Sequence, residues 1–159
     1  MPTAIVGISG IYISTNPNEE IITHSLGSCI GMTAYDPKAK VGGMIHYMLP
    51  LSKISPEKAK LKPGMFADTG IPTLLKKILE SGASKDRLIV KIAGGAQLMD
   101  KNKVFNIGER NYLVLRKLLW KNRILIDKED VGGSASRTMR LEMDTGRVTI
   151  KSGRGVTEL

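Results

Sequence analysis

Apolar side chains alternate with polar ones, or form short runs bounded by glycine, proline and asparagine, along much of the chain. This pattern is typical of β-strands, in which successive side chains point to opposite faces of a sheet. We expect strands in eight segments: residues 3–14, 21–25, 29–35, 43–49, 87–93, 123–127, 137–143 and 147–151.

Two of these segments form a predicted β-hairpin. Asp36-Pro37 and Gly42 lie between segments 29–35 and 43–49, and such residues favour a tight reversal of the chain. The hairpin places His46 on the strand that pairs with the strand beginning at Cys29.

A helical period of apolar residues appears at two places in the chain. Over 71–79, apolar residues recur at spacings of three and four, which predicts a helix that Asp68 or Thr69 caps and that Gly82 ends. A second helix is predicted at about 109–121.

The length and the order of these elements indicate a single domain over residues 1–159. A chain of 159 residues buries roughly two-thirds of its unfolded surface, which is enough to fold without a disulfide. The stretch 50–66 contains three prolines and is expected to be an irregular loop, a kind of segment that is often functional. Many strands and two helices predict an α+β fold in which helices pack outside a sheet or a pair of sheets.

The charge is strongly basic, with 24 Lys and Arg against 15 Asp and Glu, a formal net charge of +9. The cations are spread along the chain, and aromatic residues make up only 4% of it, so no stacking platform for nucleic-acid bases is evident. We therefore expect a solvated basic surface, and an acidic protein is a better candidate partner than nucleic acid.

The chain contains a single cysteine, which excludes an internal disulfide and suits a reducing compartment. Its first residues lack the basic start and continuous apolar run of a signal peptide, and no stretch approaches the roughly 18 apolar residues of a membrane span. We expect a cytoplasmic protein that does not insert into a membrane.

The single cysteine lies in the sequence Gly27-Ser28-Cys29-Ile30-Gly31, which has the form of a nucleophile elbow with Cys in place of Ser. An elbow leads from a strand into a helix, whereas a strand is predicted here, so an α/β-hydrolase fold is excluded. The flanking glycines still allow close backbone approach, and backbone N–H groups of the turn, at Gly27, Ser28 and Ile30, are candidate donors to an oxyanion.

A cysteine nucleophile acts as a thiolate, which a nearby imidazole usually supplies. The chain has two histidines, and we favour His46 over His24, since cross-strand neighbours approach within roughly 5–6 Å. No acidic residue closely precedes the turn, so Thr23 is the candidate that orients the imidazole through its hydroxyl.

Simpler readings of these residues stay open at this point. Cys29 also fits an inert buried position, His46 a half-buried strand residue, and Thr23 a β-branched strand former. A zinc site built from His24, Cys29 and His46 lacks a fourth ligand at a familiar spacing, so neither a metal nor another cofactor is expected.

Longer motifs resemble a known family. The string T-x-x-LGSC, followed by YDP and GGM-x-H-x-MLP, is similar to the chemoreceptor glutamine deamidase family, CheD, of bacterial and archaeal chemotaxis. Further matches in the family's order cover nearly the whole chain: KIAGGA at 91–96 with Met99, Asn106-Ile107-Gly108 with Asn111, and Asp130-Val131-Gly132-Gly133 before Arg137. His24 and the run GGSASR at 132–137 depart from the family's pattern.

The resemblance implies that Cys29 is the nucleophile, His46 the general base and acid, and Thr23 the orienting residue. It also implies packed mixed sheets with outer helices, similar to the toxin deamidase cytotoxic necrotizing factor. The implied reaction is hydrolysis of glutamine side chains on chemoreceptor helices through a Cys29 thioester, with a CheC-type phosphatase as a second partner. A non-catalytic module that regulates such a phosphatase is the alternative.

Overall fold

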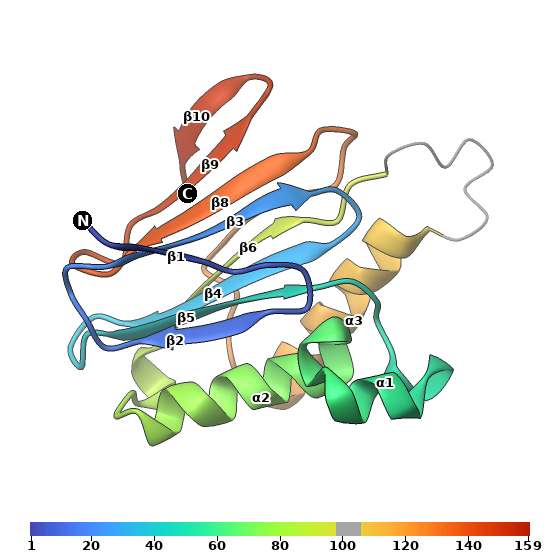
Figure 1. The fold of residues 1–159 in the computed structure, drawn as a ribbon, viewed down its shortest axis with the longest axis horizontal. Coiled ribbons are helices and arrows are strands. Elements are labelled where there is room, and N and C mark those ends of the chain that lie inside the picture. Colours follow the sequence, from blue (N-terminus) through green and yellow to red (C-terminus); the bar gives the residue numbers. More distant parts are fainter. Residues whose placement is uncertain (98–105) are drawn as a thin grey trace.

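The computed structural model describes residues 1–97 and 106–159, which form two five-stranded β-sheets and three α-helices. The sheets pack face to face, and the helices cover the outer face of one of them, which gives three layers (Figure 1). The first sheet has the order β1 (Thr3–Ile5), β3 (Glu20–Leu26), β8 (Arg137–Glu142), β9 (Val148–Ser152) and β10 (Gly155–Glu158). The second has the order β2 (Ile11–Ser14), β5 (Val41–Tyr47), β4 (Ile30–Asp36), β6 (Ile89–Gly94) and β7 (Lys128–Val131).

Both sheets are mixed. In the first sheet β1 pairs with β3 in parallel, in the second β6 pairs with β7 in parallel, and the remaining pairs are antiparallel. The structure therefore confirms the predicted α+β class and the packed mixed sheets with helices outside them.

The predicted hairpin forms the middle of the second sheet. Strands β4 and β5 are antiparallel and every residue in both is buried, because the first sheet covers one of their faces and helices cover the other. Ile45 and Tyr47 point towards the helices, whereas Met44 points into the layer between the sheets. By strand alternation His46 also points between the sheets.

The helices are α1 (Pro56–Leu61), α2 (Ala67–Glu80) and α3 (Ile107–Lys121). Helix α2 buries the predicted apolar face against β2 and β5, while α3 packs against α2 and β4. The predicted capping of α2 is wrong, because no side chain caps its first turn. Instead Asp68 accepts hydrogen bonds from the backbone and hydroxyl of Ser52, and Thr69 donates to the carbonyl of Pro63.

Several sequence-based boundaries are also wrong. Segment 3–14 is two strands in different sheets, because the chain leaves one sheet and enters the other across the loop between β1 and β2. Segment 50–66 contains α1 and two 3-10 turns rather than only irregular loop. The strand predicted over 123–127 begins later, as β7, and β10 was not predicted.

Candidate active site

Cys29 and His46 lie at the open end of the β4–β5 hairpin. His46 is directly opposite Gly31 in the register, and Cys29 precedes Gly31 by two residues, so their side chains share a face of the sheet. Cys29 packs against the apolar cluster between the two sheets, which is also the layer into which His46 points. The structure thus brings the predicted nucleophile and the predicted base to one corner of the inter-sheet layer.

Thr23 reaches the same corner from β3, in the opposite sheet. Its hydroxyl lies 2.6 Å from the carbonyl oxygen of Val6 and 2.7 Å from Nδ1 of His46, and both side chains are fully buried. A carbonyl can only accept, so the single hydroxyl proton is donated to Val6. Thr23 must therefore accept a hydrogen bond from Nδ1–H of His46.

This hydrogen-bond direction fixes the tautomer of the imidazole. With its proton on Nδ1, neutral His46 carries a lone pair on Nε2. That Nε2 is buried and makes no hydrogen bond within the described part of the chain, so a buried base is left unpaired. Val6 was not foreseen from the sequence, because it contributes a backbone carbonyl that any residue type would supply.

Burial keeps both reactive groups neutral in the resting protein. It lowers the pKa of His46 to about 4, because the buried imidazolium loses its hydration. It also raises the pKa of the half-buried Cys29 thiol, an effect that the backbone N–H of Cys29 itself opposes. The resting pair is a thiol and an imidazole, and proton transfer between them must accompany the reaction.

The backbone of His46 is held by the loop between β1 and β2. Its carbonyl accepts a hydrogen bond of 2.8 Å from the N–H of Ser9, and its own N–H donates to the carbonyl of Gly10 at 3.1 Å. These contacts fix the backbone of His46, and the hydrogen bond to Thr23 orients its ring.

The turn that carries Cys29 is tied down through its carbonyl groups. The N–H groups of Ala96 and Gly95 donate to the carbonyls of Gly27 and Cys29, at 2.8 and 2.9 Å. Gly94, at a φ of +110°, must be glycine, since a Cβ atom there would lie 2.2 Å from the carbonyl oxygen of Cys29. The family-like KIAGGA motif therefore serves as the backing of the cysteine turn.

Asn111 on α3 completes this support. Its side-chain amide, fully buried, donates to the carbonyls of Ser28 at 2.9 Å and Met48 at 2.8 Å, which joins the cysteine turn to the strand end beyond His46. The hydroxyl of Tyr47 in turn donates to the backbone carbonyl of Asn111. The sequence analysis included Asn111 in a motif but gave it no role. The structure shows that this polar residue is buried within α3, and its two hydrogen bonds explain why an Asn is there.

Arg137 links the loop before β8 to Gly94, which supports the cysteine turn. It is buried and donates to the carbonyls of Gly132 at 2.7 Å and Gly94 at 3.2 Å, and it pairs with Asp130 at 3.3 Å. The divergent run at 132–137 thus retains the arginine that holds this loop against Gly94. Met99, which the family resemblance of the sequence also included, lies outside the described residues.

The predicted oxyanion donors do not all fit. The N–H of Gly27 already donates to the carbonyl of Ser25 at 3.0 Å, so this donor is in use. The N–H of Ser28 finds no acceptor among the described residues, and Ile30 starts β4 between the strands β5 and β6. Because Ile30 is paired with Tyr47 and Gly94 in the sheet, the candidate donors that stay open are the N–H groups of Ser28 and Cys29.

His24 lies beside this site but points away from it. It follows Thr23 on β3 and is exposed, whereas Thr23 is buried, so the two side chains lie on opposite faces of the strand. The structure brings His46, and not His24, to Thr23. Among the described residues no group of three His, Cys, Asp or Glu side chains is placed to hold a metal ion.

A cleft of about 420 Å³ opens beside the loop between β1 and β2 and the end of β5, and none of Cys29, His46 and Thr23 lines it. Ser9, which binds the His46 backbone, and Met48, two residues beyond His46, both line it. The remaining lining residues are Ile8, Lys58, Leu61, Lys62 and Met65, so the cleft is apolar with two lysines on its side formed by α1 and the turn after it.

Within residues 1–97 and 106–159, no helix is long and apolar enough to cross a membrane.

Sequence comparisons decide the family. A model of the family described as CheD chemotactic sensory transduction matches residues 48–152. The chain belongs to the CheD family. The predicted resemblance is thereby confirmed, and the match extends from the end of the His46 strand through the KIAGGA, Asn111 and Arg137 motifs to β9.

Curated relatives of the CheD family align along the whole chain. A protein of Syntrophus aciditrophicus, named probable chemoreceptor glutamine deamidase CheD 1, is 50% identical over 98% of this chain and 97% of its own length. Probable chemoreceptor glutamine deamidases of Solibacter usitatus and Anaeromyxobacter dehalogenans are 50% and 46% identical over 100% of this chain and 94% and 100% of their own lengths. A crystal structure of a Neisseria meningitidis protein of the family DUF152 aligns with a TM-score of 0.47 at 7% identity, over 84% of this chain and 63% of that one, which is too distant to inform the site.

Proposed function

We propose that this CheD protein is a cysteine-dependent glutamine deamidase that acts on the cytoplasmic helices of chemoreceptors. The observation that carries the proposal is the buried chain of hydrogen bonds from His46 through Thr23 to Val6, which leaves Nε2 of His46 as an unpaired base. Buried oxygens of Asn111 and Glu19 also lack a partner among the described residues, but Nε2 of His46 belongs to an imidazole base on the face of the sheet that Cys29 shares, which favours a chemical role.

The first half of the reaction forms a thioester. Nε2 of His46 takes the thiol proton of Cys29 as the sulfur attacks the amide carbon of the glutamine side chain, and the carbonyl oxygen becomes an oxyanion. Backbone N–H groups of the turn at Ser28 and Cys29 stabilise that oxyanion. The imidazolium then gives its proton to the departing nitrogen, the C–N bond breaks, and ammonia leaves.

The second half returns the enzyme to its starting state. Neutral His46 takes a proton from water as the hydroxide attacks the thioester carbonyl, and the C–S bond breaks to release the glutamate side chain. Nε2 then returns its proton to the Cys29 thiolate. The receptor gains one negative charge, a local change that biases a two-state signalling element.

Asn111 acts as a positioning residue in this proposal. Its two hydrogen bonds set the Cys29 turn relative to the strand end that carries His46.

No hydrogen bond joins Nε2 of His46 to another described group, so the Cys29 thiol must rotate towards Nε2 when substrate binds. Catalytic hydrogen bonds commonly tighten in this way in the substrate complex.

The cleft beside the end of β5 is the proposed seat of the receptor helix. Its apolar lining fits the apolar stripe of a receptor helix. Lys58 and Lys62 favour a helix that also carries acidic side chains. A CheC-type phosphatase that presents a similar helix would compete with the receptor for this cleft. The resemblance to cytotoxic necrotizing factor and the single domain over residues 1–159 stay predictions.

The proposal is tested by the mass of a receptor cytoplasmic domain incubated with the protein. We expect a gain of about one dalton per glutamine converted with the native protein and none with Cys29→Ala, since the nucleophile is gone. Circular dichroism of Cys29→Ala must show an intact fold, which a half-buried turn position permits. Conversion by Cys29→Ala would contradict the proposal, and a native protein that binds a CheC-type phosphatase but converts no receptor would establish the alternative of a binding module.

A further inference from the structure

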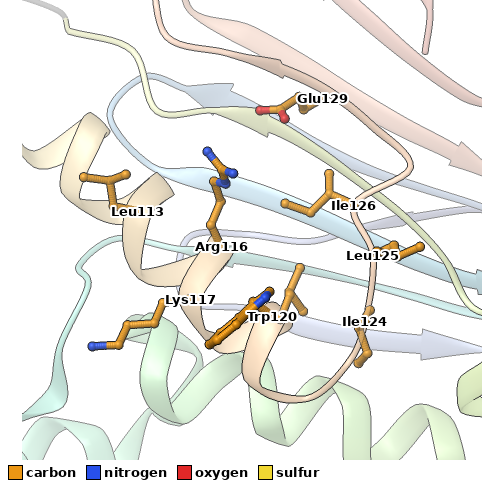
Figure 2. Close-up of a pocket in the computed structure, with 9 residues that line it drawn as sticks. Leu113, Arg116, Lys117, Trp120, Ile124, Leu125, Ile126 and Glu129 are labelled. Atoms are coloured by element: carbon orange, nitrogen blue, oxygen red, sulfur yellow. The ribbon is translucent and has the colours of Figure 1, made fainter.

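A second hollow lies on α3, away from the cysteine turn. Figure 2 shows it between the C-terminal half of α3 and the segment 124–126 that leads to β7. Its volume is about 570 Å³. The apolar groove is lined by Leu113, Arg116, Trp120, Ile124, Leu125 and Ile126, among others.

Large apolar side chains stand uncovered along this groove. Leu113 is 51% exposed, Trp120 79% and Leu125 82%. Leu113 and Trp120 are seven residues apart on α3 and so lie on one stripe of the helix, with Arg116 between them (Figure 2). Single exposed apolar residues are ordinary, whereas these three surround one hollow.

The chain segment beside the groove is rich in basic residues, two of which, Arg116 and Lys117, line the groove itself. Residues 110–126 contain five Lys and Arg and no Asp or Glu, and none of these five cations forms an ion pair with a described residue. Arg116 stacks against Tyr112, 5.8 Å from the ring centroid, and the acidic side chain on the rim is that of Glu129. The groove therefore combines apolar walls with two cations, Arg116 and Lys117, and a single carboxylate, Glu129.

These features select one kind of occupant. A second copy of this chain would bring a net charge of +9 against an already basic surface, which repels it. The apolar side chains flank a hollow between a helix and an extended segment, a shape that a second helix fills better than a flat membrane surface does. We propose that the groove binds an amphipathic helix of a partner protein, with an apolar stripe in the hollow and acidic residues facing Arg116 and Lys117.

Trp120 makes the proposal directly measurable, because it is the only tryptophan in the chain. The probe is a helical peptide of about 20 residues, roughly 30 Å long, with leucine at i, i+3, i+4 and i+7 and glutamate elsewhere. We expect saturable binding that shifts Trp120 emission to shorter wavelengths and weakens as salt is added. The matched peptide with lysine in place of glutamate should bind at least about tenfold more weakly.

Variants that keep Trp120 as the fluorescent reporter distinguish binding in the groove from binding elsewhere on the surface. Leu125→Glu should lower the affinity for the acidic peptide by about tenfold or more. Arg116→Glu should reverse the preference between the acidic and the basic peptide. Val156→Glu, at a similarly exposed apolar residue on β10, should change neither. The test needs no deamidase activity, so it stands apart from the proposed function.

Three results would overturn the proposal. The first is equal binding of both peptides, or none. The second is an emission shift that depends on protein concentration without peptide, which would indicate a second copy. The third is a larger shift with vesicles containing phosphatidylglycerol than with the acidic peptide, which would indicate a membrane surface.

Discussion

The two ends of the β4–β5 hairpin treat buried polar groups in opposite ways. At the turn end lies Asp36, whose side chain is fully buried. Its carboxylate accepts hydrogen bonds from the backbone of Lys38, Ala39 and Ser84 and forms an ion pair of 2.9 Å with Arg87. Both oxygens of the Asp36 carboxylate are therefore engaged.

The open end, with Cys29 and His46, leaves its key atom without a partner. His46 is also fully buried, yet only its Nδ1 side is engaged, by Thr23, and Nε2 has no hydrogen bond within the described part of the chain. Burial alone cannot explain this difference, because both side chains are buried to the same degree.

The pKa values follow the same division. Burial acts to raise the pKa of Asp36, but the hydrogen bonds from Arg87 and the backbone outweigh it and hold that pKa well below the usual range, so the charge is kept. At the open end no charged partner offsets the burial of His46, so its pKa is lowered and the imidazole stays neutral. A satisfied buried charge stabilises the fold, whereas an unsatisfied neutral base is available for chemistry.

The largest effect that sharpens this contrast is expected from His46→Ala. Turnover should fall by about a thousandfold or more, since the proposed base is removed, and circular dichroism must show that the fold survives the loss of the buried ring. Receptor deamidation measures the loss of turnover. The rate of Cys29 alkylation at neutral pH, which we also expect to fall, measures the loss of the base that takes the thiol proton. His24→Ala, with its exposed side chain, is the matched control and should leave both rates near those of the native protein; the reverse ranking would make His24 the base.

Thr23→Val is expected to have the next largest effect. Valine keeps the β-branched shape of the strand residue but removes the acceptor for Nδ1–H, so the tautomer is no longer fixed and turnover falls by about tenfold to a thousandfold. Thr23→Ser restores the hydroxyl and should recover most of the activity. Full activity in Thr23→Val would show that Thr23 only forms the strand.

Asp36→Asn should have the smallest effect on turnover and act on stability instead. An amide cannot accept all the donors around it, so we expect a loss of roughly 2 kcal/mol in the free energy of unfolding, measured with urea. The native pKa of Asp36 lies below its unfolded value, so its contribution is present above about pH 4 and is lost as the pH falls further. Unchanged stability at neutral pH would remove the contrast between the two ends.

Much of the fold follows from local sequence patterns. The hairpin was predictable because its turn residues and its two apolar runs adjoin each other, and α2 because its apolar face has a regular period. The division of 3–14 between two sheets was not, since it depends on which distant strands, β3 and β5, pair with each half. The register of β7 likewise depends on β6 rather than on its own composition.

The site was predictable only where side chains carry it. Thr23, His46 and Cys29 stand out by residue type, and the hydrogen bond between Thr23 and His46 agrees with the predicted pairing. The contributions of Val6, Gly95 and Ala96 are made by backbone atoms, which a sequence does not distinguish. The engaged N–H of Gly27 was missed for the same reason.

The central claim is that Cys29 forms a thioester with the receptor glutamine. The most direct measurement quenches the reaction of the native protein and a glutamine-containing receptor helix in acid, digests the mixture, and weighs the fragment that contains Cys29. We predict an adduct equal to the receptor fragment less one ammonia, labile to hydroxylamine, that accumulates in the native protein and is absent from Cys29→Ala. Conversion of the receptor glutamine with no adduct on Cys29, at reaction times shorter than one turnover, would contradict the claim.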